Sequence, residues 1–175
     1  CQFFFFGDRE YQTIKQIFET TEKNETNKPY LYWHVMLCSH HCSKAVMYAK
    51  EGEDSTEKFK KDIMDFFNSY ARSGEVYIVS SSHSKFTDGD GDNPPHKKAR
   101  KRYEEIIKPG CFICTHEYPD KRNPKPLVFS VGSEGLVFDD IRKKEIGSAR
   151  LAATVEAARG GKQPPTTQIG FGANE

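Results

Sequence analysis

The chain has 175 residues, a length that fits one domain with a sizeable core. Charged residues make up 29% of it and almost cancel, with a formal net charge of +1, so nothing marks the chain as a general binder of nucleic acids or membranes. No apolar run approaches the roughly 18 residues that a membrane-spanning helix needs. The opening segment 1–6 is short and lacks a basic leader, so we do not expect a signal peptide.

The first fifty residues predict one helix and three strands. The apolar segment 1–6 predicts a short strand, and Asp8 can cap a helix that continues to about Lys23. Segment 30–38 is rich in aromatic and β-branched residues, which favours a strand. Segment 43–50 predicts another strand, and the short link between the two favours a β-hairpin.

An amphipathic helix follows, capped by Asp54 or Ser55 and stopped near Gly74. Its apolar positions recur at helical spacing: Phe59, Ile63, Phe66, Phe67 and Tyr70. Segment 75–81 is mostly apolar, as expected of a strand covered on both faces of its sheet.

The remaining elements alternate in the same way. A proline, Pro94 or Pro95, opens a helix over about 96–107. Further strands are predicted over 111–118, 127–131 and 136–138, a last helix over 139–159, and a flexible tail over 160–175. This order predicts one α/β domain over 1–159, built as a three-layer α/β/α sandwich with a mixed sheet.

Two segments carry a resemblance to a known family. Ser55-Thr56-Glu57 opens the predicted helix after the hairpin, and Val76 to Ser82 forms the next strand. With the element order over residues 8–118, they resemble the cytidine deaminase superfamily, including its AID/APOBEC-like and bacterial-like branches. In that family a His-x-Glu motif stands at the first place and Ser-Pro-Cys-x-x-Cys at the second.

The resemblance implies zinc chemistry, in which a bound water is activated by the metal and a glutamate carries protons. Here Ser55 replaces the histidine ligand, and no Cys-x-x-Cys follows Ser82. Glu57 is the catalytic residue that would remain. The resemblance therefore implies a pseudoenzyme that acts by binding. Two alternatives stay open: Glu57 as a helix-capping residue, and an active hydrolytic deaminase with His83 and His96 as unusual metal ligands.

The cysteines form a separate group of candidates: Cys38, Cys42, Cys111 and Cys114. If the strand that begins at Cys111 ran antiparallel to the first strand of the hairpin, its start would lie near the hairpin tip. A disulfide from Cys38 or Cys42 to Cys111, a structural zinc site, and buried free thiols are then equally plausible.

A dense basic run lies in the predicted helix over 96–102, with its charges at Lys97, Lys98, Arg100, Lys101 and Arg102. It could bind nucleic-acid phosphates or act as a nuclear address. The alternative is a solvated face that balances the acidic loop before it.

Asn24-Glu25-Thr26 matches the N-glycosylation pattern in a polar loop. This pattern and the odd number of cysteines, which is five, together favour an extracellular location slightly over a cytoplasmic or nuclear one. A secreted interaction protein held by disulfides is therefore a further hypothesis for the function.

Overall fold

A parallel sheet organises the chain in the computed structural model, which describes residues 1–52, 55–89, 93–133 and 135–142. Its four strands are β1 (Phe3–Phe5), β2 (Val35–Leu37), β5 (Tyr77–Ser80) and β6 (Phe112–Cys114). They lie in the order β1-β2-β5-β6, and every neighbouring pair is parallel. The predicted strands at the start of the chain and at 75–81 are confirmed, and all four residues of β5 are buried.

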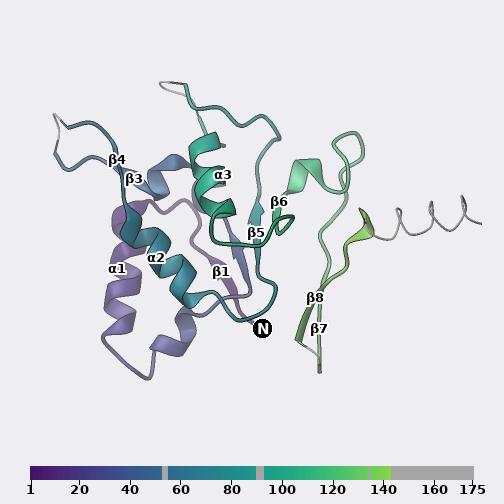
Figure 1. Ribbon diagram of the computed structural model, residues 1–175, viewed down its shortest axis with the longest axis horizontal. Helices are drawn as coiled ribbons and strands as arrows, with labels where there is room; N and C mark the ends of the chain where they lie inside the picture. The colour runs from purple at the N-terminus through teal and green to yellow at the C-terminus, as the bar shows by residue number, and fades with distance from the viewer. Residues whose placement is uncertain (53–54, 90–92, 134, 143–175) are drawn as a thin grey trace, which may run out of the picture. The chain divides into compact units, whose positions relative to one another are not determined.

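Three helices of the described residues cover one face of this sheet: α1 (Tyr11–Glu22), α2 (Lys61–Tyr70) and α3 (Lys97–Glu104) (Figure 1). Each lies in the connection between two adjacent parallel strands. Because such crossovers have one hand, strands laid down in sequential order place all their helices on the same face. The core between helices and sheet is aromatic, and it includes Phe6, Phe18, Phe67 and Tyr103.

A β-hairpin lies on the other face of the sheet. Strands β7 (Phe129–Gly132) and β8 (Gly135–Phe138) pair in antiparallel fashion. The Tyr77 ring of β5 contacts Phe129 at 5.4 Å and Phe138 at 5.2 Å between ring centroids. The α/β class is thus confirmed, but the prediction of a mixed main sheet is wrong, and a hairpin covers the face on which helices were expected.

The predicted hairpin between segments 30–38 and 43–50 does not form. Both edges of β2 are already paired, with β1 on one side and β5 on the other, so β2 has no edge left for a following strand. The chain instead turns after Cys38, and β3 (Tyr48–Ala49) pairs with β4 (Lys58–Phe59).

The second helix begins later than predicted. The α2 helix starts at Lys61, because the preceding residues are held in β4 and the Lys60 amide donates to the Met47 carbonyl at 2.9 Å. From Ile63 onward the predicted apolar face is correct, with Ile63, Phe67 and Tyr70 buried.

The remaining predictions are met in part. The basic helix is confirmed as the shorter α3, and the strand predicted over 111–118 is reduced to β6 and a turn of 3-10 helix at Thr115–Glu117.

Residues 1–139 form one compact unit, and a second begins at Asp140. Most of the predicted last helix, the boundary at 159 and the tail lie outside the described residues. No helix within the described ranges is long and apolar enough to cross a membrane.

Candidate functional site at the carboxyl end of the sheet

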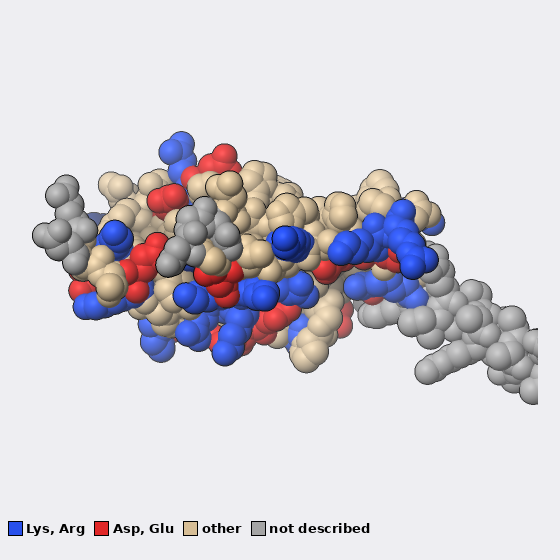
Figure 2. Space-filling model, turned by 90° about the horizontal axis from the view of Figure 1, so that it is seen from above, with Lys and Arg blue, Asp and Glu red and all other residues tan. Residues whose placement is uncertain are grey.

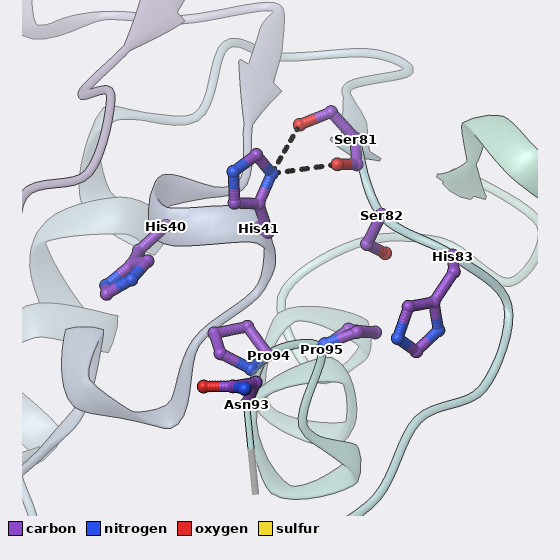
Figure 3. Close-up of a pocket in the computed structure, with 8 residues that line it drawn as sticks. All are labelled: His40, His41, Ser81, Ser82, His83, Asn93, Pro94 and Pro95. Carbon is purple, nitrogen blue, oxygen red and sulfur yellow. Dashed lines mark hydrogen bonds between the residues drawn. The ribbon is translucent and has the colours of Figure 1, made fainter.

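A pocket of about 360 Å³ opens where the central strands β2 and β5 end. Two chain segments that follow these strands line it, together with a third that leads into α3 (Figure 3). The lining residues are His40, His41, Ser81, Ser82, His83, Asn93, Pro94 and Pro95. In open α/β sheets, ligands bind outside the carboxyl ends of the strands, at the point where the strand order reverses. The order β1-β2-β5-β6 contains no such reversal, so this pocket is the candidate site by its place at the carboxyl ends and its polar lining alone.

The turn after β2 has an unusual backbone. His40, His41 and Cys42 have φ angles of 48°, 52° and 66°, so three successive residues with side chains adopt the left-handed conformation. Such residues cost of order 1–3 kcal/mol each and persist where surrounding structure holds them. Ser39 provides that restraint, because its hydroxyl donates toward the Gly7 and Arg9 carbonyls. The turn therefore holds two histidines, His40 and His41, at the carboxyl end of the sheet.

His41 is oriented by the loop that follows β5. Its Nδ1 lies 2.9 Å from the Ser81 carbonyl oxygen and 3.5 Å from the Ser81 hydroxyl. Since a carbonyl oxygen can only accept, Nδ1 carries a proton and donates in the first contact. The imidazole thus joins the ends of two strands across the pocket.

His83 has the opposite arrangement. The Lys85 amide donates to its Nδ1 at 3.0 Å, which leaves the proton of the neutral ring on Nε2. Ser82 lies beside it, and the Ser82 hydroxyl shares a hydrogen bond of 2.7 Å with Ser80. In Figure 3 the Ser82 hydroxyl and the His83 ring point toward the space above Pro95. This wall of the pocket therefore has a donor at His83 Nε2, and a second at the Ser82 hydroxyl when Ser80 donates in their shared hydrogen bond.

The lining has no acidic residue and is rich in polar hydrogens, which most of its eight residues carry. On the turn side, a Glu10 carboxylate oxygen lies 3.6 Å from Nδ1 of His40. That nitrogen is buried and forms no hydrogen bond with the described residues.

The His41–Ser81 pair and the Cys38 thiol are not arranged as activated nucleophiles. A serine nucleophile needs a ring nitrogen that can accept its proton, but the nitrogen of His41 nearest to Ser81 is the one that donates. The buried Cys38 thiol is no better, because burial raises its pKa well above the usual value and a hydrogen bond with Cys42 adds to this.

The structure places Glu57 elsewhere. It precedes β4, outside any helix, and its carboxylate lies 3.0 Å from Lys44 Nζ. It lines a different pocket, beside Tyr11 and Tyr48. The prediction that Glu57 occupies the first turn of a helix is therefore wrong, and its contact is an ion pair at the surface.

The residues of the suggested metal site do not fit zinc. The Ser55 hydroxyl closes a local turn, accepting from the Gly52 amide at 3.0 Å. His83 lines the carboxyl-end pocket, whereas His96 is buried and accepts from the Lys44 amide at 3.2 Å. Across the described ranges, no group of three or more His, Cys, Asp or Glu side chains is arranged to hold a metal ion.

All five cysteines are free thiols in the structure. Because β6 is parallel to β5, and β5 to β2, the orientation assumed for a bridge to Cys111 is wrong. Cys111 precedes β6, while Cys114 ends it, at the same sheet end as Cys38 and Cys42.

The basic run divides into two groups on α3. Arg100 and Arg102 are tied to carboxylates, with nitrogen–oxygen distances of 2.9 Å to Glu104 and 3.0 Å to Glu105. The three lysines (97, 98 and 101) are exposed and form no ion pair with any described residue. Figure 2 shows blue and red side chains interleaved rather than one continuous basic surface.

Asn24 is exposed after α1, and its side-chain oxygen accepts from the Thr26 hydroxyl at 2.6 Å. Glycosylation at this position stays a prediction.

Sequence reasoning missed most of the pocket. A local signal did exist, since the polar run Ser81 to His83 directly follows the buried strand β5. Nothing local indicated that His41 and Pro95 would join it, because the tertiary fold brings them there.

The class that fold and site define is an α/β domain with a parallel sheet and a pocket at the carboxyl end of the strands. Comparisons with protein-family models, curated proteins and solved structures found no match to this chain.

Proposed function

We propose that this chain is a ligand-binding domain that holds a small acidic molecule in its carboxyl-end pocket. The observation that carries the proposal is the wall formed by Ser82 and His83, which offers donors at the end of a buried parallel strand. The proposal keeps the binding role expected from the sequence. It moves the site from Glu57 to the end of β5.

The position of the pocket supports a ligand site rather than an incidental hollow. The turn at its rim keeps His40, His41 and Cys42 in the left-handed backbone conformation. Backbone strain of this kind is concentrated at functional sites. A relationship to the deaminases remains a hypothesis, and binding at this pocket does not depend on it.

Inorganic phosphate is the simplest probe. We expect titration of ¹⁵N-labelled protein to shift the amide signals of residues 81–83 and Asn93, while an equal ionic strength of sodium chloride leaves them in place. The double variant Ser82→Ala/His83→Gln should abolish these shifts. Shifts that appear only at lysines on the surface, or that survive the double variant, would overturn the proposal.

A second candidate function is binding of single-stranded nucleic acid by α3. The observation in its favour is the exposure of three lysines without an ion pair to the described residues. Reversing all three charges, as Lys97→Glu, Lys98→Glu and Lys101→Glu, should weaken oligonucleotide binding and lower the slope of log affinity against log salt by about 2.

The matched control reverses three exposed lysines outside α3: Lys23, Lys50 and Lys121. Fluorescence anisotropy at several salt concentrations measures both variants. Equal losses in the two would show that only overall charge matters, and would exclude a site on α3.

A further inference from the structure

The two walls of the carboxyl-end pocket differ in chemistry. Ser82 and His83 form a polar wall, and the rings of Pro94 and Pro95 form an apolar one (Figure 3). Pro95 is fully buried, so the half-buried Pro94 supplies the accessible part of this wall. A ligand that satisfies both walls needs an acidic group at one end and an apolar, preferably flat, group at the other.

The acidic group must bind the side chains of the polar wall. The start of α3 lies close in sequence to Pro95, and a helix start can bind anions through its amides. Here, however, the Lys97 amide donates to the Thr87 carbonyl at 3.1 Å and the Lys98 amide donates to Asp88 at 2.9 Å. These two amides are used already. His83 Nε2 can donate to the ligand, and so can the Ser82 hydroxyl when Ser80 is the donor in their shared hydrogen bond.

The flat group suits the proline wall. The accessible part of the Pro94 ring gives an aromatic ring van der Waals contact. Lys97 and Lys98 are exposed at the start of α3. Their positive potential favours a negatively charged ligand nearby. The pocket volume of about 360 Å³ suits a molecule of this kind rather than a polymer.

We infer that the pocket takes a nucleoside monophosphate, with the phosphate on Ser82 and His83 and the base packed on Pro94. This inference rests on the proposed function and names its ligand class.

The test compares four probes by isothermal titration: AMP, ribose 5-phosphate, adenosine and inorganic phosphate. AMP should bind most tightly. Ribose 5-phosphate should bind about ten-fold more weakly because it lacks the base. Adenosine should bind at least about ten-fold more weakly than AMP, because it lacks the phosphate and so has no charged hydrogen-bond acceptor.

Variants locate the site. His83→Gln and Ser82→Ala should each weaken AMP binding, the first by about ten-fold. The matched controls are His116→Gln and Ser130→Ala, which change exposed residues of the same types outside the pocket and should leave the affinity within two-fold.

The outcomes separate the two proposals. If phosphate binds through Ser82 and His83 but AMP binds no better than ribose 5-phosphate, the nucleotide inference fails and the acidic-ligand proposal stands. If adenosine binds as well as AMP, the phosphate is not recognised and the nucleotide inference fails. If no acidic probe binds, or if the control variants weaken AMP as much as His83→Gln does, both fail.

Discussion

The carboxyl-end pocket and the segment around Glu57 are both polar, but they use their polar groups differently. In the Glu57 segment each prominent side chain is paired locally: Glu57 with Lys44 at 3.0 Å, and Glu51 with Lys60 at 2.8 Å. These pairs stabilise turns at the surface. In the pocket, donors on the loop after β5 face a cavity instead. The comparison shows that a carboxylate in a promising sequence context can form a surface ion pair, while a less conspicuous serine and histidine line a pocket.

Both regions depend on the aromatic core beneath them. Phe67 is fully buried and its ring lies 6.0 Å from Phe6 and 6.1 Å from Tyr103. Replacing it with alanine leaves a cavity, and we expect Phe67→Ala to lower the free energy of unfolding by about 3–5 kcal/mol. Urea denaturation measures this loss.

The control for the core variant is Phe5→Ala, because Phe5 is 65% exposed on the edge strand β1. It should cost no more than about 0.5 kcal/mol. Equal losses in the two variants would contradict the assigned core.

A smaller effect is expected beside the Glu57 segment, where Asp62 joins α1 to α2. Burial would raise the pKa of Asp62, but hydrogen bonds from Lys15 at 2.7 Å and Tyr11 at 2.8 Å outweigh it and lower the pKa. A carboxyl whose pKa is lowered by folding stabilises the protein above its unfolded pKa, and the stabilisation is lost as the pH falls through the folded pKa.

We therefore expect Asp62→Asn to destabilise the protein at pH 7 and to match the wild type more closely as the pH falls below about 4. The loss at pH 7 should be only about 0.5–1 kcal/mol, because the Asp62 side chain is 38% exposed and solvent screens the pair. Urea denaturation at several pH values measures it. A difference that grows in acid would have the wrong sign.

The sequence predicted local structure well where one pattern dominated. The unbroken apolar run from Val76 to Val79 predicted β5, and the spacing of Ile63, Phe67 and Tyr70 predicted the buried face of α2. These signals depend on neighbours along the chain.

The failures involve partners distant in sequence. Segment 30–38 resembles one arm of a hairpin, yet β1 and β5 take both edges of β2. The left-handed backbone at His40 contains no glycine that would predict it. The pocket unites His41, Ser82 and Pro95 only after the sheet is assembled, so no local pattern could reveal it.

The smallest expected effect is that of Glu57→Gln. The Glu57 side chain is 40% exposed, and a surface ion pair of this kind contributes about 0–1 kcal/mol to stability. Because Glu57 lies outside the carboxyl-end pocket, the variant should bind phosphate and AMP as the wild type does.

The decisive measurement is the AMP dissociation constant of wild-type protein, Glu57→Gln and His83→Gln, determined side by side by isothermal titration. We predict that Glu57→Gln stays within two-fold of the wild type, whereas His83→Gln binds about ten-fold more weakly. A loss of affinity in Glu57→Gln with His83→Gln unchanged would contradict a ligand site at the carboxyl end of the sheet.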